Sequence, residues 1–341
     1  MKKILVTGGC GYVGSALVPR LLTQGYWVRA YDAQWFGNGF LPENEHLKLI
    51  KADIREIGKF SEACQGADAV IHLACLSNDY CCQLDEALST EINYNAFEPL
   101  VIEAKRAGVK RFIYCSSSSV YGVSDQPDVT EDHPLIPLTL YNKYKGLCEP
   151  LLLKHQSDHF TTVIIRPATV CGAAPRQRFD LTVNILTQHA IMKGVMTVFG
   201  GGQKRPNLHI KDMCAVYECL LKAPKSKIAG EIFNVGRQNM SVLAIAELIQ
   251  RIVPLYGFPK PIIEVKEYQD NRSYHINSDK IKRVLGFEPE YSVEDAIRDL
   301  CINFKSDFAG TTNFYKDSLT NPIYTNVKQY IDKHQMGKRA A

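Results

Sequence analysis

The 341-residue sequence lacks two features that would place it at a membrane or on nucleic acid. No apolar run approaches the roughly 18 residues that a membrane-spanning helix requires. The net charge of +4 is small for a chain of this length, so bulk charge gives no drive toward nucleic acid. The basic and apolar residues 1–6 run directly into a glycine-rich turn, which favours a buried first strand over a signal peptide. We therefore expect neither a membrane nor a nucleic acid as a partner.

Metal-ligand spacing is also missing, although the chain contains 11 cysteines. None of them form a Cys-x-x-Cys pair, and the adjacent Cys81 and Cys82 cannot bind zinc by themselves. Several cysteines lie inside apolar runs, as Cys115 does, and a free cysteine packs there like a small apolar residue. We therefore expect no metal, no disulfides and a reducing, cytoplasmic compartment.

The chain does contain a regular alternation of short apolar runs with amphipathic stretches. The runs predict strands at 3–6, 27–31, 47–50, 69–73, 111–115 and 162–165. The stretches predict helices that include 15–24, 86–107 and 140–155. This alternation is typical of an α/β fold with a doubly wound parallel sheet of the Rossmann type.

The alternation loosens after about residue 175. We expect a dinucleotide-binding domain over residues 1–175, to which a strand near 231–236 returns. A smaller C-terminal substrate lobe is expected over 176–310. The polar and aromatic residues 311–341 are expected to form a tail that either packs as a cap or stays mobile.

A glycine-rich segment, TGGCGYVG at residues 7–14, follows the first predicted strand and opens the first helix. Its glycines allow a tight turn, close approach of the backbone to phosphate, and close packing of helix on strand. A dinucleotide pyrophosphate then binds at the positive end of the helix. The expected cofactor contacts in this turn are Gly8, Gly11, Tyr12, Val13 and Gly14.

Acidic and small residues at the ends of the next strands extend this expected cofactor site. Asp32 ends the second strand, where a carboxylate binds the adenosine ribose and repels the extra phosphate of NADP. We therefore expect NAD, and Arg29 and Arg55 keep NADP as the less favoured alternative. Asp53 would either bind the adenine amino group or cap the next helix. Ile54, Leu73 and Ala74 are further expected cofactor contacts.

A second motif, Tyr141 and Lys145, places a phenol and an ammonium on one face of a helix. The ammonium stabilises the phenolate, which lowers the pKa of the tyrosine toward working pH. A serine run, 116–119, precedes this pair. The similar pair at 324–328 follows no serine strand, so we interpret it as unrelated.

Together these motifs resemble the extended short-chain dehydrogenase/reductase family. Within that family they are similar to the NAD-dependent nucleotide-sugar epimerase/dehydratase branch, which includes UDP-glucose 4-epimerase-like proteins. The resemblance runs from residue 1 to about 305 and rests on segments 7–14, 72–74, 116–122, 141–145 and 166–172. It implies that Tyr141 is the catalytic base, that Lys145 binds the nicotinamide ribose, and that Ser117 is the catalytic serine. It also implies that Pro167 passes the nicotinamide.

The resemblance further implies a set of substrate contacts. Ser118 and Ser119 stand where the family's dehydratases carry an Asp-Glu pair, so 4,6-dehydration is disfavoured. Arg205 and Arg272 match arginines that grip the nucleotide diphosphate, which suits the bidentate geometry of guanidinium. The expected substrate contacts are Ser117, Ser118, Ser119, Asn184, Arg205 and Arg272.

Four nearby residues are interpreted as structural. Arg176 and Arg178 are expected at the entry to the lobe, where contact with phosphate or base is the less favoured alternative. Cys171 is expected to be a buried thiol rather than an acid/base. His209 is expected to be a packed core histidine, because the spacing offers it no acidic partner.

These expectations converge on an enzyme that acts on a nucleotide-diphosphate sugar. The favoured hypothesis is an NAD-dependent epimerase that works through a transient keto-sugar, with C4 as the favoured position of the ketone. The alternatives are a 4-dehydrogenase or ketoreductase, an epimerase at carbons beside the ketone, and a non-catalytic NAD-binding regulator. The resemblance also implies a homodimer formed through the helical stretches 86–107 and 140–155.

Overall fold

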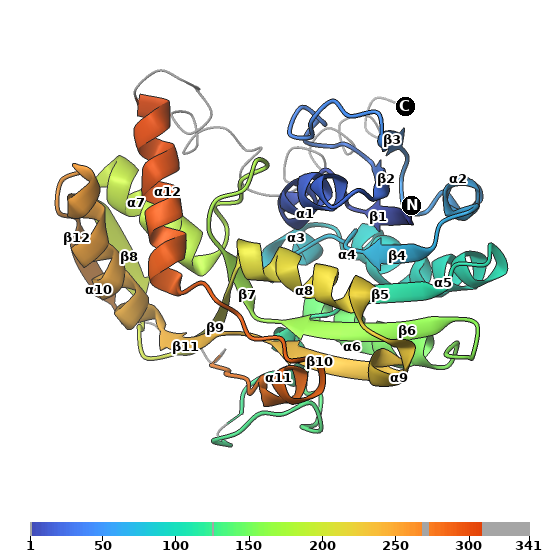
Figure 1. Cartoon of the computed structure of the whole chain (residues 1–341). Helices are drawn as coiled ribbons and strands as arrows, with labels where there is room; N and C mark the ends of the chain where they lie inside the picture. The colour runs from blue at the N-terminus through green and yellow to red at the C-terminus, as the bar shows by residue number, and fades with distance from the viewer. Residues whose placement is uncertain (1, 125, 268–272, 309–341) are drawn as a thin grey trace, which may run out of the picture.

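A seven-stranded parallel sheet forms the centre of the computed structural model, which describes residues 2–124, 126–267 and 273–308 (Figure 1). The strand order is β10-β6-β5-β4-β1-β2-β3. The strands are β1 (Lys3–Thr7), β2 (Trp27–Asp32), β3 (Leu47–Lys51), β4 (Ala69–His72), β5 (Arg111–Cys115), β6 (Thr161–Pro167) and β10 (Glu231–Val235). The predicted doubly wound α/β sheet is confirmed.

Both faces of the central strands β1, β4, β5 and β6 are largely buried, which explains the apolar runs in these strands. In β1, Ile4 and Val6 pack into the core on one face and Leu5 packs into the core on the other. The first core is covered by α1 (Tyr12–Thr23), α8 (Ile210–Lys222), α9 (Lys225–Ile228) and α11 (Asp279–Leu285). The second is covered by α2 (Ile57–Cys64), α3 (Asp79–Leu84), α5 (Phe97–Arg106) and α6 (Leu140–Leu153).

The helix predicted over 86–107 is not a single regular α-helix. It consists of α4 (Glu86–Thr90), a π-helix (Glu91–Asn95) and α5. The wider π turn carries Asn93, whose amide accepts a hydrogen bond from the Leu76 N–H at 2.8 Å and donates to the Leu76 carbonyl at 2.9 Å. The π turn thereby provides hydrogen-bond partners for buried backbone groups after β4. The periodicity of the helical stretch alone does not reveal that these groups need a partner.

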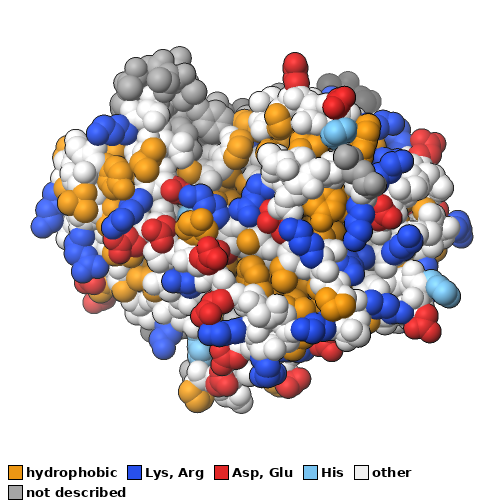
Figure 2. Space-filling view, in the orientation of Figure 1, with side chains coloured by type: hydrophobic (Ala, Val, Ile, Leu, Met, Phe, Trp, Pro, Cys, Tyr) orange, Lys and Arg blue, Asp and Glu red, His pale blue; other side chains and the backbone are white. Residues whose placement is uncertain are grey.

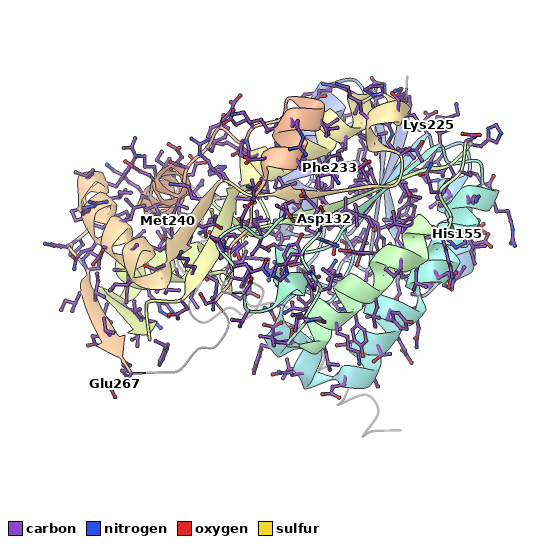
Figure 3. All side chains as sticks on the ribbon, turned by 90° about the horizontal axis from the view of Figure 1, so that it is seen from below. Asp132, His155, Lys225, Phe233, Met240 and Glu267 are labelled. Atoms are coloured by element: carbon purple, nitrogen blue, oxygen red, sulfur yellow. The ribbon has the colours of Figure 1, made fainter. Side chains whose placement is uncertain are left out.

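The smaller C-terminal lobe lies to one side of the sheet (Figure 1). Its elements are α7 (Thr182–Lys193), α10 (Val242–Ile252), a 3₁₀ turn (Val253–Tyr256), α12 (Val293–Phe308) and the parallel pair β8 (Val195–Phe199) and β12 (Ile262–Lys266). A three-stranded sheet connects it to the main body through β7 (Thr169–Cys171), β9 (Lys204–His209) and β11 (Gln238–Ser241). From below, Met240 and Glu267 mark the lobe, and His155 and Lys225 lie at the opposite end of the molecule (Figure 3).

The surface seen in Figure 2 intersperses lysine and arginine with aspartate and glutamate. None of the described helices is long and apolar enough to cross a membrane. Within the described ranges, no group of three or more histidine, cysteine, aspartate or glutamate side chains is arranged to hold a metal ion.

Candidate active site

A cavity opens at the carboxyl ends of the strands, where the order of the sheet reverses between β1 and β4. Its walls come from the glycine-rich turn, from the ends of β2 to β6, and from the segment between β7 and α7. Every expected cofactor contact lies in these walls, namely Gly8, Gly11, Tyr12, Val13, Gly14, Asp32, Asp53, Ile54, Leu73, Ala74, Lys145 and Pro167.

The glycine-rich turn has the shape of an anion cradle. Gly8 has a φ of +70°, and a Cβ added there would lie 2.9 Å from the Ala74 nitrogen. A Cβ on Gly14 would lie 2.2 Å from the Gly8 carbonyl oxygen. Gly11 is the N-cap of α1, so the first backbone N–H groups of that helix open toward the cavity. The turn therefore fits a dinucleotide pyrophosphate.

Asp32 is fixed at the edge of this cradle. Its carboxylate accepts hydrogen bonds from the backbone N–H of Gln34 at 2.6 Å and of Cys10 at 3.0 Å. Burial raises the pKa of Asp32, while these two N–H groups and the nearby Arg176 oppose that rise. The carboxylate is thus oriented from within the turn, as contact with ribose hydroxyls requires.

Arg29 and Arg55, which kept NADP as the alternative cofactor, both bind other groups of the protein. Arg29 donates to two backbone carbonyl groups at 2.6 and 2.7 Å. Arg55 pairs with Asp53 at 2.9 Å and with Glu91 at 2.7 Å. The alternative that Asp53 caps a helix is wrong, because α2 begins after Glu56. The Asp53 carboxylate, in the cavity wall, instead pairs with Arg55.

The phenol and the ammonium lie on successive turns of α6. Lys145 is buried, and its Nζ donates to the Cys115 carbonyl at 2.6 Å. The same Nζ lies 5.8 Å from the centroid of the Tyr141 ring. Burial raises the pKa of Tyr141 well above its ordinary value, and the Arg178 guanidinium acts in the opposite direction. The phenol therefore depends on neighbouring positive charge to become a base.

The serine run forms a hydroxyl relay beside Tyr141. Ser117 and Ser119 share a hydrogen bond between their Oγ atoms at 2.7 Å, and Ser119 donates to Asn142 Oδ1 at 2.5 Å. Ser117 and Ser119 lie in the cavity wall. Ser118, in the 3₁₀ turn Ser118–Tyr121, is buried in the protein instead, so the expected direct contact with substrate does not follow from its position.

A buried ion pair that the sequence analysis missed supports this serine run. Glu149 accepts from Ser116 Oγ at 2.6 Å and from Arg166 Nε and Nη2 at 3.0 and 2.6 Å. Arg166 also donates to the Tyr121 hydroxyl at 2.7 Å. A signal for Glu149 was available, because it lies two helical turns after Tyr141 on the same side of α6.

The lobe side of the cavity differs from expectation at several positions. Arg205 lies in the wall, with its guanidinium over the Tyr274 ring. Arg272 falls outside the described residues. Asn184 is fully buried, and its amide binds the Gly172 N–H at 3.0 Å and the Arg178 carbonyl at 2.9 Å. Asn184 therefore holds the entry segment together, and the expectation of substrate contact is corrected.

Arg176 and Arg178, for which a structural role at the lobe entry was favoured, both lie in the cavity wall. The Arg176 guanidinium lies 4.1 Å from the centroid of the Phe36 ring, and its backbone N–H donates to Ser15 Oγ at 3.0 Å. Burial lowers the pKa of Arg176 to about 10. Both arginines enter the wall because the segment between β7 and α7 folds back over the cofactor side.

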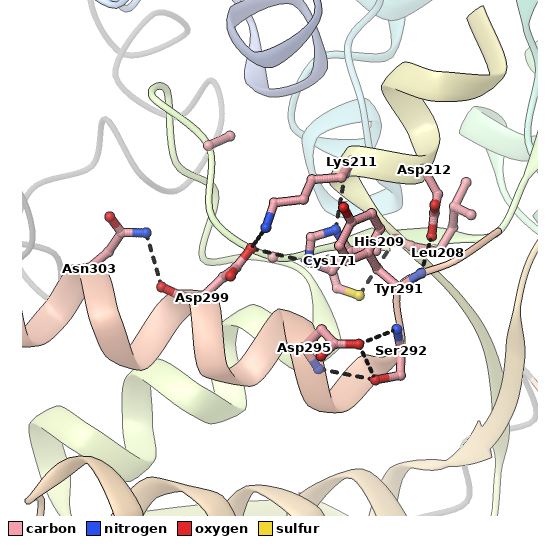
Figure 4. Close-up of polar contacts among 12 residues, drawn as sticks. Cys171, Leu208, His209, Lys211, Asp212, Tyr291, Ser292, Asp295, Asp299 and Asn303 are labelled. Atoms are coloured by element: carbon pink, nitrogen blue, oxygen red, sulfur yellow. Dashed lines mark hydrogen bonds and ion pairs between the residues drawn. The ribbon is translucent and has the colours of Figure 1, made fainter. Parts of the chain in front are cut away.

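His209 has an acidic partner after all (Figure 4). Its Nε2 lies 3.4 Å from Asp299 Oδ2 on α12, and the same carboxylate pairs with Lys211 at 2.8 Å. Cys171 is buried beside this group and donates to the Leu208 carbonyl. Burial raises the pKa of the Cys171 thiol, which does not suit an acid/base role. This cluster joins the lobe helix to β9.

Comparisons with known proteins agree with this geometry. The model of the NAD dependent epimerase/dehydratase family matches residues 4–236. The low-salt glycan biosynthesis protein Agl12 of Haloferax volcanii is 27% identical over 317 residues, which cover 88% of this chain and 97% of that protein. The UDP-glucose 4-epimerase of Lactobacillus helveticus is 26% identical, with coverage of 86% and 94%. The structure of MoeE5 in complex with UDP-glucuronic acid and NAD has a TM-score of 0.78 at 25% identity, with coverage of 89% and 99%.

Proposed function

The chain belongs to the NAD-dependent epimerase/dehydratase family and is an enzyme that uses NAD, and from this premise we propose that it is a nucleotide-sugar epimerase. It would act through a transient keto-sugar, with the C4 hydroxyl as the favoured site of oxidation. The relatives of the chain include a UDP-glucose 4-epimerase, and a similar structure contains UDP-glucuronic acid with NAD. These names support a nucleotide-diphosphate sugar as the substrate class.

The cavity residues divide the work of one proton and one hydride. NAD, held by the glycine-rich turn and Asp32, would supply a hydride acceptor for the carbinol carbon and a hydride donor for the keto-sugar. The Tyr141 phenolate, which Lys145 stabilises before the transfer, accepts the hydroxyl proton and becomes neutral. Ser117 donates a hydrogen bond to the reacting oxygen and so stabilises the negative charge that develops on it. Return of the hydride to the opposite face of the keto-sugar inverts the carbon, and Tyr141 then returns the proton.

The observation that carries this proposal is the combination of a complete Ser117, Tyr141 and Lys145 set in one cavity with serines at 118 and 119. Elimination of water across a C–C bond needs an acid and a base beside the leaving hydroxyl. Ser118 is buried, and the Ser119 hydroxyl is engaged with Asn142. These two positions offer no carboxyl group, which favours hydride return over dehydration.

Incubation with a panel of UDP-, GDP-, CDP- and dTDP-sugars in heavy water, followed by NMR, tests the proposal. Inversion at C4 without deuterium uptake is the expected result. Deuterium beside the ketone would indicate epimerisation at a neighbouring carbon, and accumulating NADH would indicate a dehydrogenase. Cofactor binding with no change in any sugar would favour a regulator.

The variant Tyr141→Phe separates chemistry from binding. It is expected to retain NAD and to lose turnover, because the phenol oxygen is the only atom removed. Tyr144→Phe on the same helix is the matched control, since the Tyr144 hydroxyl bonds Thr90 Oγ1 at 2.6 Å outside the cavity wall. Turnover by Tyr141→Phe at the rate of this control would refute the assigned base.

A further inference from the structure

Asn142, the residue after Tyr141, lies in the wall of the catalytic cavity and is only 6% exposed. Its position is fixed from two sides. Its backbone N–H donates to Oγ1 of Thr139, the N-cap of α6, at 3.4 Å. Its side-chain oxygen accepts from Ser119 Oγ at 2.5 Å. Asn142 therefore joins the helix that carries the phenol to the turn that carries the serines.

The contact with Asn142 fixes the direction of the hydrogen bond between Ser117 and Ser119. A serine hydroxyl has one proton to donate. Ser119 gives its proton to Asn142 Oδ1, so in the 2.7 Å contact between the two Oγ atoms Ser117 is the donor and Ser119 is the acceptor. Ser117 Oγ itself accepts from the Ser119 backbone N–H at 3.2 Å. The chain of hydroxyls thus runs from Ser117 through Ser119 to Asn142.

This direction gives the Ser117 proton two alternative partners. The proposed reaction needs it on the sugar oxygen, where it stabilises developing negative charge. In the structure it is on Ser119, whose oxygen can accept it because the Ser119 proton is held by Asn142. Loss of a hydrogen bond without a replacement costs free energy. Ser119 therefore provides a replacement partner when the sugar oxygen leaves Ser117.

We propose that Asn142 is a positioning residue that keeps Ser119 ready to accept the Ser117 proton, so that the keto-sugar can leave the serine and rotate between the two hydride transfers. No proton leaves Ser117 in this step. Its O–H turns from the sugar oxygen to Ser119 Oγ, and one hydrogen bond breaks as another forms. The inference rests on the proposed function, because epimerisation is the reaction in which the keto-sugar must turn within its site.

A neutron crystal structure of the NAD-loaded protein, exchanged into heavy water and free of sugar, shows the direction itself. The Ser119 deuteron is expected on the line to Asn142 Oδ1, and the Ser117 deuteron on the line to Ser119 Oγ. An Asn142 amide turned by half a rotation would donate to Ser119 and reverse the chain. A Ser119 deuteron directed at Ser117 would therefore overturn the inference.

Two variants remove the replacement partner of Ser117 in different ways. Ser119→Ala deletes the acceptor, whereas Asn142→Leu leaves the Ser119 proton free to turn toward Ser117. Both are expected to hold the keto-sugar on Ser117 more tightly and to lower kcat. The steady-state amount of bound keto-sugar, read from the absorbance of the reduced nicotinamide, should rise about fivefold, which corresponds to one neutral hydrogen bond. An unchanged amount in Ser119→Ala would overturn the inference.

The double variant separates this role from a merely structural one. Because Asn142 acts on Ser117 through Ser119, adding Asn142→Leu to Ser119→Ala should raise the bound keto-sugar no further, and additive effects would refute the positioning role. Ser119→Thr keeps the hydroxyl and should behave like the unaltered enzyme. Ser124→Ala is the matched control, since the Ser124 hydroxyl bonds His133 Nε2 at 2.9 Å outside the cavity wall, and it should leave the bound keto-sugar unchanged.

The two proposals fail separately in this design. The neutron structure requires no sugar, so the expected deuteron positions in a protein that converts no nucleotide sugar would support the positioning of Ser119 by Asn142 and refute the epimerase. Inversion of a nucleotide sugar by a protein whose Ser119 deuteron points to Ser117 would leave the epimerase standing and refute the role of Asn142.

Discussion

Among the described residues that contact Arg166 in the interior of the main domain, Glu149 is the only one that does so with a negative charge. Replacing Glu149 with glutamine removes that charge. The side chains of Arg166 and Glu149 are 4% and 3% exposed, and two hydrogen bonds of 3.0 and 2.6 Å join them. The glutamine would keep the shape of the site and an oxygen for Ser116. The remaining direct hydrogen-bond partners of Arg166 would be the neutral Tyr121 hydroxyl and Glu131 carbonyl, and the Glu131 carboxyl would be the nearby acid that is left.

The expected loss of stability is large for a single atom exchange. Breaking a buried ion pair from one side typically costs about 3–5 kcal/mol, because the remaining charge stays desolvated. Urea unfolding of Glu149→Gln against the unaltered protein measures it. Arg298→Met removes one member of the exposed pair with Glu294 on α12 and should cost less than about 1 kcal/mol.

A double variant separates the charge from the packing. Glu149→Leu with Arg166→Met replaces the pair by apolar side chains, and such replacements are often neutral within a few kcal/mol. We expect it to be more stable than Glu149→Gln. A cost for Glu149→Gln as small as that of Arg298→Met, or a double variant less stable than the single one, would refute the reasoning. Because Glu149 also holds Ser116, kcat should fall in Glu149→Gln more than NAD affinity does.

Three further predictions follow from single positions. Gly14→Ala should weaken NAD binding at least tenfold by calorimetry, since its Cβ would lie 2.2 Å from a loop carbonyl, whereas Gly58→Ala, with open space around its Cβ, should not. Burial lowers the pKa of His72 to about 3. The pKa of His72 in the unfolded chain is about 6.5. The neutral His72 side chain therefore causes no loss of stability above that pH, and the free energy of unfolding falls as pH drops from there toward 3, by about 2 kcal/mol at pH 5. Urea unfolding should show a shallower pH dependence in His72→Gln. If the exposed faces of α5 and α6 form a homodimer, Ile102→Asp and Leu147→Asp, at side chains 38% and 39% exposed, should give monomers by light scattering; unchanged mass would count against that interface.

The sequence by itself determined the class of fold and the two motifs of the cavity, because both depend on short-range order along the chain. The glycine-rich turn after β1 needs only its neighbours to form, and Tyr141 and Lys145 share a helix face by the period of the helix. The alternation of apolar runs predicted every strand of the sheet up to β6. The predicted cofactor contacts share one cavity because the carboxyl ends of parallel strands meet at one edge.

Only the tertiary structure decided which charges meet. Arg178 reaches the cavity through Asp180 and Asn78, Arg166 finds Glu149 across the β6–α6 layer, and His209 finds Asp299 on α12. Except for the neighbours Arg178 and Asp180, these partners are far apart in the sequence, and no periodicity of the chain relates them. Asn184 illustrates the same limit of sequence-based prediction. Its amide side chain suits a polar ligand, but in the folded protein it binds buried backbone groups. Long-range pairings depend on how helices and strands pack against one another, and local sequence patterns do not specify that packing.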